Sequence, residues 1–116
     1  MKYNPFTNTK YHNKKVTVNG ETFDSEHEYE RWCELKLLER VGEISNLKYQ
    51  VRFDLLPSQY LGKKCLERGV AYIADFVYRD KGDNQVVEDA KGAKTKDYII
   101  KRKLMLWVHH IKIMEV

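Results

Sequence analysis

Hydrophobic and polar residues alternate in a way that predicts a hairpin and then a helix in the first third of the chain. Two β-rich segments flank Asn19-Gly20, which supplies the positive φ angles of a tight turn, so residues 15–23 are predicted to form a hairpin. Apolar residues at helical spacing continue to about Arg40 and predict a helix. Asp24 or Ser25 can cap it, because either side chain accepts hydrogen bonds from the first helical turn.

The middle of the chain predicts strands joined by polar segments. Residues 44–56 predict a turn followed by a strand, and residues 57–69, which include two glycines, predict a polar connection. Residues 70–78 and 85–91 are both rich in β-forming residues and are separated by a turn-prone stretch. These two runs therefore predict an antiparallel hairpin.

The last third of the chain predicts a second helix and a final strand. Thr95 can cap a helix over residues 96–108, and residues 110–115 predict a strand. The order of elements is then hairpin, α, β, β, β, α, β, which indicates an α/β domain with a mixed sheet. We expect this domain to occupy residues 15–116, preceded by a flexible basic arm over residues 1–14.

Length and composition restrict the class of protein. A chain of 116 residues is long enough for one compact domain, and 42% hydrophobic with 33% charged residues is typical of a globular fold. We find no apolar stretch of membrane-spanning length and no signal segment at the N-terminus, so we expect a cytoplasmic protein with no membrane partner. Cys33 and Cys65 lack the close spacing of a metal or redox motif and are predicted to be free thiols.

Charge is distributed unevenly along the chain. The net charge is only +4, from 21 basic and 17 acidic residues, but basic segments flank an acidic centre over residues 24–43. This distribution suits a polyanion held beside a cation site, although solvated helix faces give a similar pattern. The second helix is apolar around most of its circumference, which predicts that it is mostly buried and that its cations extend into a polar site or to the surface. The candidate nucleic-acid contacts are Lys14, Lys15, Lys94, Lys96, Lys101 and Arg102.

The predicted hairpin over residues 70–91 brings two carboxylates together. A turn centred on Gly82 pairs residues whose numbers sum to 164, which places Asp75 opposite Asp89. Two opposed carboxylates repel each other unless something neutralises them, and a divalent cation is suited to do so. Strand alternation places Lys91 on the same face as Asp89, whereas Glu88 and Ala90 point to the other face.

A third acid comes from the first helix. Glu28 lies on the apolar stripe of that helix, between Trp32 and Leu35, so it is predicted to face inward. An inward glutamate can simply pair with a buried lysine or arginine. Alternatively, three carboxylates and one lysine that meet at a sheet edge form a site of hard oxygen ligands suited to Mg²⁺.

These residues resemble the PD-(D/E)XK nuclease superfamily, whose motif is an acid on one strand followed by (D/E)-x-K on the next. Here the motif is Asp75 with Asp89-Ala90-Lys91. More closely, the chain resembles a phage-encoded family of unassigned function that is grouped with the Holliday-junction-resolvase-like nucleases. That resemblance spans about residues 11–108 and rests on an ordered set: Phe23-Asp24-Ser25 with Glu28, Gly42-Glu43-Ile44, Leu47, Gln50, Tyr72 to Phe76, Val87 to Gly92, and Thr95.

The resemblance implies a restriction-endonuclease-like αβββαβ core with a metal site. It implies Mg²⁺ or Mn²⁺ held by Glu28, Asp75, Asp89 and the Ala90 carbonyl, with Lys91 as the catalytic lysine. The chain departs from the motif at Ala74, where the superfamily name has proline, a position that varies freely. A one-residue slip in strand register would exchange Glu88 for Asp89 as the second-strand ligand. Gln50 is a possible accessory residue that orients a water molecule or simply donates at a sheet edge.

The preferred hypothesis is a metal-dependent DNA endonuclease that selects branched DNA such as a Holliday junction, with no small-molecule substrate. A symmetric homodimer is expected, because one site of this kind cuts one strand and a two-fold axis supplies the second. The alternative is a catalytically silent module on the nuclease fold that binds nucleic acid or a partner. A third possibility is a nuclease directed at RNA. If the chain is phage-encoded, its cytoplasm is that of the host cell.

Overall fold

The structure, a computed structural model, describes residues 15–18, 20–90 and 93–116. It begins with a small hairpin of β1 (Val16–Val18) and β2 (Glu21–Phe23), in which Gly20 has a φ of 84°. The predicted N-terminal hairpin is therefore confirmed. The predicted flexible arm over residues 1–14 lies outside the described residues.

Helix α1 (Glu26–Arg40) follows the hairpin directly. The Ser25 side chain accepts a hydrogen bond from the Glu28 backbone N–H at 3.1 Å, so Ser25 rather than Asp24 is the N-cap. The helix stops where predicted, just before Gly42, which adopts a φ of 85°.

A four-stranded sheet forms the centre of the molecule. Its strands lie in the order β3 (Ser45–Leu56), β6 (Val70–Arg79), β7 (Gln85–Asp89) and β8 (Met114–Glu115). The first three are antiparallel, and β8 pairs with β7 in parallel, so the sheet is mixed as predicted. The final strand is shorter than the predicted 110–115, since His110 takes a left-handed conformation with φ of 58° and ends the preceding helix.

The register of the β6–β7 hairpin agrees with the sequence prediction. Phe76 pairs with Glu88 and Arg79 pairs with Gln85, so paired numbers sum to 164. In the connecting turn, one carboxylate oxygen of Asp80 accepts hydrogen bonds from two backbone N–H groups, each at 2.9 Å. This bonding fixes the turn and therefore the register.

Helix α2 (Lys96–His109) returns the chain to the sheet. Thr95 caps it as predicted, accepting from the Tyr98 N–H at 3.1 Å. The prediction that this helix is mostly buried is wrong: only Tyr98 and Met105 are buried, while Trp107 is 78% exposed. A helix that lies on one face of a sheet buries only the stripe that contacts the sheet, and no other described element covers its outer side.

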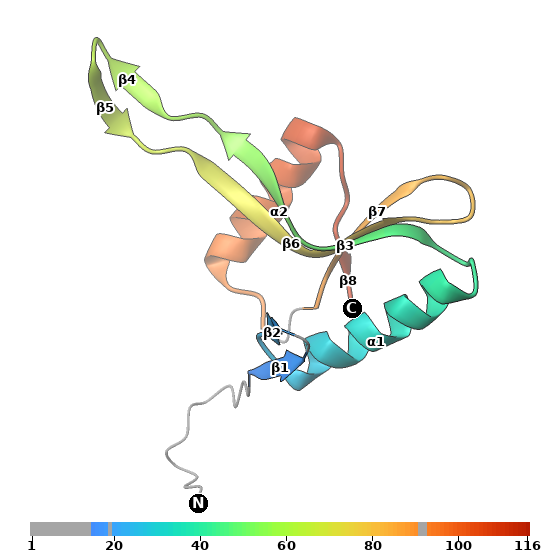
Figure 1. The fold of residues 1–116 in the computed structure, drawn as a ribbon. Coiled ribbons are helices and arrows are strands. Elements are labelled where there is room, and N and C mark those ends of the chain that lie inside the picture. Colours follow the sequence, from blue (N-terminus) through green and yellow to red (C-terminus); the bar gives the residue numbers. More distant parts are fainter. Residues whose placement is uncertain (1–14, 19, 91–92) are drawn as a thin grey trace, which may run out of the picture.

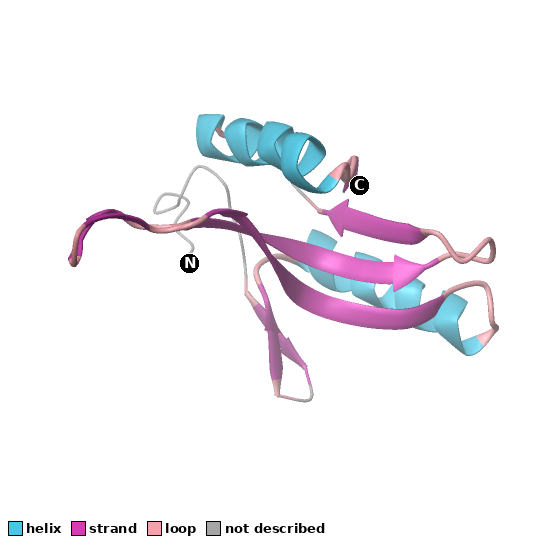
Figure 2. Ribbon diagram, turned by 90° about the horizontal axis from the view of Figure 1, so that it is seen from above, coloured by secondary structure: helices cyan, strands magenta, loops and turns pink. Residues whose placement is uncertain are grey.

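Residues 57–69 form a hairpin, so the prediction of a plain polar connection is wrong. Strands β4 (Gln59–Leu61) and β5 (Lys64–Glu67) pair around Gly62, which has a φ of 61°. We call residues 57–69 the arm, because they extend β3 and β6 away from the rest of the molecule (Figures 1 and 2). Every residue of the arm is exposed, so neither face needs the hydrophobic alternation by which strands are recognised in a sequence.

The two helices cover opposite faces of the central sheet (Figure 2). The core on the α1 side consists of Leu35, Ile44, Phe76 and Tyr78. The core on the α2 side includes Leu55, Tyr72, Ala74, Val77, Val87 and Met105. The fold is thus mixed α/β with the order αβββαβ after the N-terminal hairpin. In the described ranges, neither helix has the length and apolar character needed to cross a membrane.

Candidate active site

Asp75 interacts with two other acidic side chains, Glu28 on the α1 side of the sheet and Asp89 on the other side. Glu28 comes from the first turn of α1 and is 3% exposed, Asp75 lies in β6, and Asp89 ends β7 with 1% exposed. The β6–β7 register places Asp75 and Asp89 one position beyond the Phe76–Glu88 pair. The structure therefore brings together the three acids that the sequence proposed as metal ligands.

The electrostatics of Asp75 reflect this crowding of carboxylates. Burial raises the pKa of Asp75 to about 8, and the negative charges of Asp89 and Glu28 add to the effect. The Ala90 backbone N–H acts in the opposite direction, donating to Asp75 Oδ2 at 2.7 Å. Asp75 is therefore an acid whose charged form needs a positive neighbour.

Asp75 lies where the alternation of β6 changes phase, opposite a distorted residue of β3. Tyr49 pairs with Phe76 and Val51 with Ala74, so Gln50 lies opposite Asp75, and Gln50 has a φ of 56°. A positive φ is costly for a residue other than glycine and is often found near functional sites. Around this position the alternation of β6 changes phase: Ala74 packs toward α2, and Phe76 packs toward α1.

Two tyrosine hydroxyls hold the acids in place. Tyr49 Oη lies 2.7 Å from Glu28 Oε1, and Tyr72 Oη lies 2.6 Å from Asp89 Oδ2. Burial and the adjacent carboxylates raise the pKa of both tyrosines, so their hydroxyls stay protonated and act as donors. Neither role was predicted from the sequence, although Tyr72 belongs to the ordered set of residues that carries the resemblance.

The alternative role for Glu28, pairing with a buried cation, finds no support among the described residues. Besides the Tyr49 hydroxyl, Glu28 accepts from the backbone N–H of Asp24 at 3.2 Å. Gln50, the possible accessory residue, donates from Nε2 to Tyr49 Oη at 3.2 Å. Gln50 thus acts on this cluster through Tyr49.

Glu88, the fallback ligand, instead belongs to a buried ion pair. Arg31 donates to its two carboxylate oxygens, from Nε at 2.8 Å and from Nη2 at 2.7 Å, and the Tyr78 hydroxyl also donates to it. Glu88 has no exposed surface and lies on the α1 side of the sheet, against Arg31 and Tyr78, whereas Asp89 bonds to Tyr72 on the other side, so the predicted alternation of the two acids holds. Arg31 was missed, although it is one helical turn from Glu28.

The donor chemistry of Glu28, Asp75 and Asp89 fits a hard divalent cation. Over residues 15–18, 20–90 and 93–116, no three His, Cys, Asp or Glu side chains are arranged as a group that could hold a metal ion. Mg²⁺ usually keeps several waters and binds through one or two carboxylates, so it does not require a closed protein shell. Lys91, the proposed catalytic lysine, lies outside the described residues.

The candidate nucleic-acid contacts separate into two groups. Lys94 and Arg102 both pair with Glu115, at 3.0 and 2.9 Å. A hydrogen bond from the Tyr98 hydroxyl, together with Arg102 and Lys94, lowers the pKa of Glu115 to about 2, so these three residues hold the C-terminal strand. The others are exposed or half-buried without such a role, namely Lys15, Lys96 and Lys101, and Lys14 lies outside the described residues.

A comparison with known protein families assigns the chain to one of them. Residues 8–114 match the family described as "Protein of unknown function (DUF1064)". The chain belongs to the DUF1064 family. No curated protein and no solved structure matches it. Because the match covers all three acids of the site, the cluster lies inside the region that defines this DUF1064 protein as a family member.

We expect Asp75→Asn to stabilise the DUF1064 protein in the presence of a chelator. The folded pKa of Asp75 is about 8, against 3.8 when unperturbed, so the native state retains a proton that the unfolded state loses between about pH 4 and 8. Wild-type stability should therefore fall as pH rises through this window. The variant, which cannot ionise there, should gain stability at both pH values and more at pH 8 than at pH 5, with a difference on the order of 3 kcal/mol.

Thermal melts of both proteins at pH 5 and pH 8 in EDTA measure this difference. Asp54→Asn is the matched control, because Asp54 is an exposed β3 aspartate, and its melting temperature should hardly change. Equal stability of wild type and Asp75→Asn at pH 8 would contradict the proposed repulsion between Asp75 and its neighbours.

Proposed function

We propose that this protein is a divalent-metal-dependent endonuclease that hydrolyses phosphodiester bonds in DNA. The observation that carries the proposal is the meeting of Glu28, Asp75 and Asp89, supplied by a helix and two adjacent strands, with a pKa of about 8 for Asp75. Such clusters of like charge destabilise the fold and are typical of functional sites. The resemblance to PD-(D/E)XK nucleases through Asp75, Asp89, Ala90 and Lys91 supports the same chemistry.

The residues that would hold Mg²⁺ or Mn²⁺ are the three acids and the Ala90 carbonyl. When bound, such an ion polarises the phosphate and lowers the pKa of a water molecule. Tyr49 and Tyr72 keep the carboxylates of Glu28 and Asp89 oriented by donating hydrogen bonds.

The proposed reaction needs no covalent intermediate. A water molecule gives up a proton to the solvent and its oxygen forms the new bond to phosphorus. The bond from phosphorus to the leaving sugar oxygen breaks, and that oxygen takes up a proton from the solvent. Lys91, assigned from the sequence, would orient that water or stabilise the negative charge that develops on the phosphate. Lys96, which is exposed, and Lys101, which is half-buried, would contact backbone phosphates from α2, and such contacts carry no sequence information.

Incubation with defined nucleic acids tests the proposal. The substrates are supercoiled plasmid, a synthetic four-way DNA junction and single-stranded RNA, each with Mg²⁺, Mn²⁺ or EDTA. We expect cleavage of DNA, strongest on the junction, in the presence of a divalent ion only. Binding without cleavage in all conditions would favour the silent binding module, and cleavage confined to RNA would redirect the assignment.

We further propose that the protein works as a homodimer in the cytoplasm, through the exposed last turn of α2. Leu106, Trp107 and Val108 are exposed there, with Trp107 at 78%, and a two-fold axis would provide two sites for two strands. Light scattering at micromolar concentration should give the dimer mass for wild type and the monomer mass for Trp107→Ser. Leu37→Ser, at a similarly exposed position on α1, is the control and should remain dimeric. A monomeric wild type that still nicks DNA would contradict the dimer.

A further inference from the structure

In the part of the chain that the structure describes, no other helix or strand covers the side chains of the arm. All residues from 57 to 69 are exposed, including Tyr60 at 62% and Leu61 at 72%. An isolated two-stranded ribbon is only marginally stable in water, because it has no second layer against which to bury apolar surface. Large apolar side chains at the tip of such a ribbon indicate a surface that is buried against another molecule.

The side chains of the arm combine apolar groups with positive charge. Leu61 lies opposite Lys64, and Tyr60 lies opposite Cys65, so each face of the ribbon carries one large apolar residue near the tip. Lys63, Lys64 and Arg68 against Glu67 give residues 57–69 a net charge of +2. This composition suits a binding partner that is a polyanion and also has flat apolar surfaces. Nucleic acid with accessible bases is such a partner.

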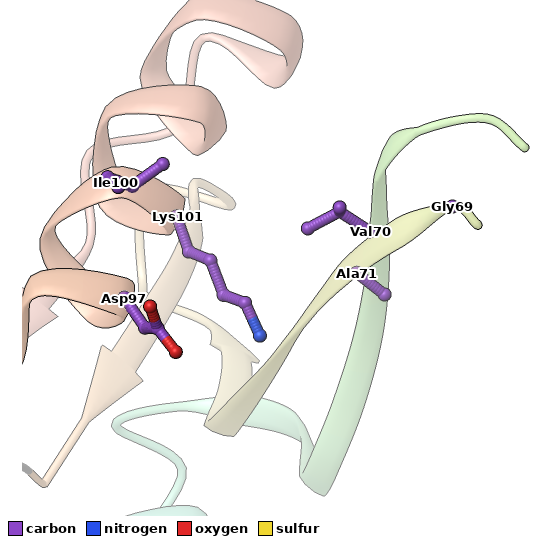
Figure 3. A pocket seen from close by; sticks show the side chains of 6 residues that line it. All are labelled: Gly69, Val70, Ala71, Asp97, Ile100 and Lys101. Atoms are coloured by element: carbon purple, nitrogen blue, oxygen red, sulfur yellow. The ribbon is translucent and has the colours of Figure 1, made fainter. Parts of the chain in front are cut away.

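A cleft lies at the base of the arm, between β6 and α2. It has a volume of about 390 Å³ and is lined by Gly69, Val70, Ala71, Asp97, Ile100 and Lys101. Figure 3 shows Lys101 reaching from α2 toward β6, with the acid Asp97 one helical turn before it. Arm, cleft and Asp75 thus follow one another along a continuous stretch of chain that ends in β6.

We infer that the arm and this cleft bind duplex DNA whose base stack is interrupted, with Tyr60 and Leu61 against the exposed bases. The basic side chains of the arm contact phosphates on either side. This inference deepens the proposed endonuclease function and rests on it for the choice of DNA. A branch point offers unstacked bases without the energy needed to open a continuous duplex, so an apolar tip favours branched over intact DNA.

The reach of the arm suits this partner. Lys64 and Asp75 are 11 residues apart, which at about 3.3 Å per residue is at most about 36 Å. One turn of duplex DNA measures about 34–36 Å, so the tip and the acids can contact one DNA arm about one turn apart. A contact between the arms of two copies suits the arm less well, because it would bring two positively charged segments together.

Binding assays in EDTA test the arm without requiring cleavage. Fluorescence anisotropy with a labelled four-way DNA junction and an intact duplex compares wild type with Tyr60→Ser/Leu61→Ser. We expect about tenfold weaker junction binding by this variant and nearly unchanged duplex binding. Lys63→Gln/Lys64→Gln should weaken binding to both DNAs and reduce the slope of log affinity against log salt by about two. Leu37→Ser, an exposed apolar change on α1, is the control and should bind like wild type.

A 2-aminopurine base at the branch point supplies a second readout. Wild type should raise its fluorescence on binding by keeping the base unstacked, and the tip variant should not. If the tip variant binds the junction as tightly as wild type and raises the 2-aminopurine fluorescence equally, the inference is overturned, even if the protein cleaves DNA. Tip-dependent junction binding in a protein that never cleaves would support the arm and reject the nuclease. Tighter binding to an RNA junction, or loss of dimer mass in the tip variant without loss of DNA binding, would also overturn it.

Discussion

Asp75→Asn and Asp89→Asn are each expected to lower divalent-dependent DNA cleavage about a thousandfold while the protein stays folded. Each substitution keeps the shape of the side chain but removes a negative charge from a site proposed to hold a divalent cation. Metal stabilisation of transition-state charge contributes several kcal/mol, and about 4 kcal/mol corresponds to a thousandfold change in rate. Lys91→Ala is expected to have a comparable effect, since the same phosphate charge would lose its cation.

The measurement is the initial rate of junction cleavage in Mg²⁺, with folding checked by circular dichroism and junction binding checked in EDTA. Asp54→Asn removes an exposed acid outside the cluster and should keep the wild-type rate within a few-fold. Undiminished cleavage by a folded Asp75→Asn protein would remove the cluster from the mechanism.

Metal binding can also be followed without activity. A ligand that binds only the folded state stabilises it by RT ln(1 + [L]/Kd), so millimolar Mg²⁺ or Mn²⁺ should raise the wild-type melting temperature. The same addition should leave the Asp75→Asn protein almost unchanged. A wild-type melting temperature that neither Mg²⁺ nor Mn²⁺ changes would argue against the assigned ligands, whatever the cleavage assay gives.

The strand register and the positions of the acids could be predicted because short-range rules determine them. Asn19-Gly20 and the Asp80 turn each restrict the backbone locally, and the second of these sets the pairing that brings Asp75 beside Asp89. Ser25 and Thr95 mark helix starts for an equally local reason, namely a side-chain oxygen facing unpaired N–H groups.

The partners of the acids could not be predicted, because they depend on how separate elements pack. Strict alternation would place Tyr72 and Phe76 on the same face, yet the break at Gln50 sends them to opposite sides of the sheet. The pairing of Glu88 with Arg31 depends on how α1 lies across β7, which no spacing within either element determines. The hairpin in the arm could not be predicted, because strands that are exposed on both faces show no alternation of hydrophobic and polar residues.

Glu88→Ala is expected to lower the free energy of unfolding by about 3 kcal/mol. Glu88 is completely buried, and removing it leaves the Arg31 guanidinium and the Tyr78 hydroxyl without their shared acceptor. Breaking a buried pair by removing one partner typically costs about 3–5 kcal/mol, and the partial exposure of Arg31 places this case at the lower end. Urea denaturation of the variant and wild type measures the difference. Glu34→Ala removes the exposed partner of Arg31 and should change stability by less than about 0.5 kcal/mol.

A second variant separates the structural role of Glu88 from a role in the site. Replacing both partners, as Arg31→Met with Glu88→Met, removes the two charges together and should recover most of the lost stability, because apolar groups of similar size often replace buried ion pairs without loss. If Glu88 only supports the fold, this double variant should also keep divalent-dependent cleavage, since Asp75, Asp89 and Glu28 are unchanged. A stable double variant without cleavage would instead make Glu88 a member of the metal site. A double variant as unstable as Glu88→Ala would mean that the hydrogen bond from the Tyr78 hydroxyl, rather than the ion pair, contributes most of the stability of this cluster.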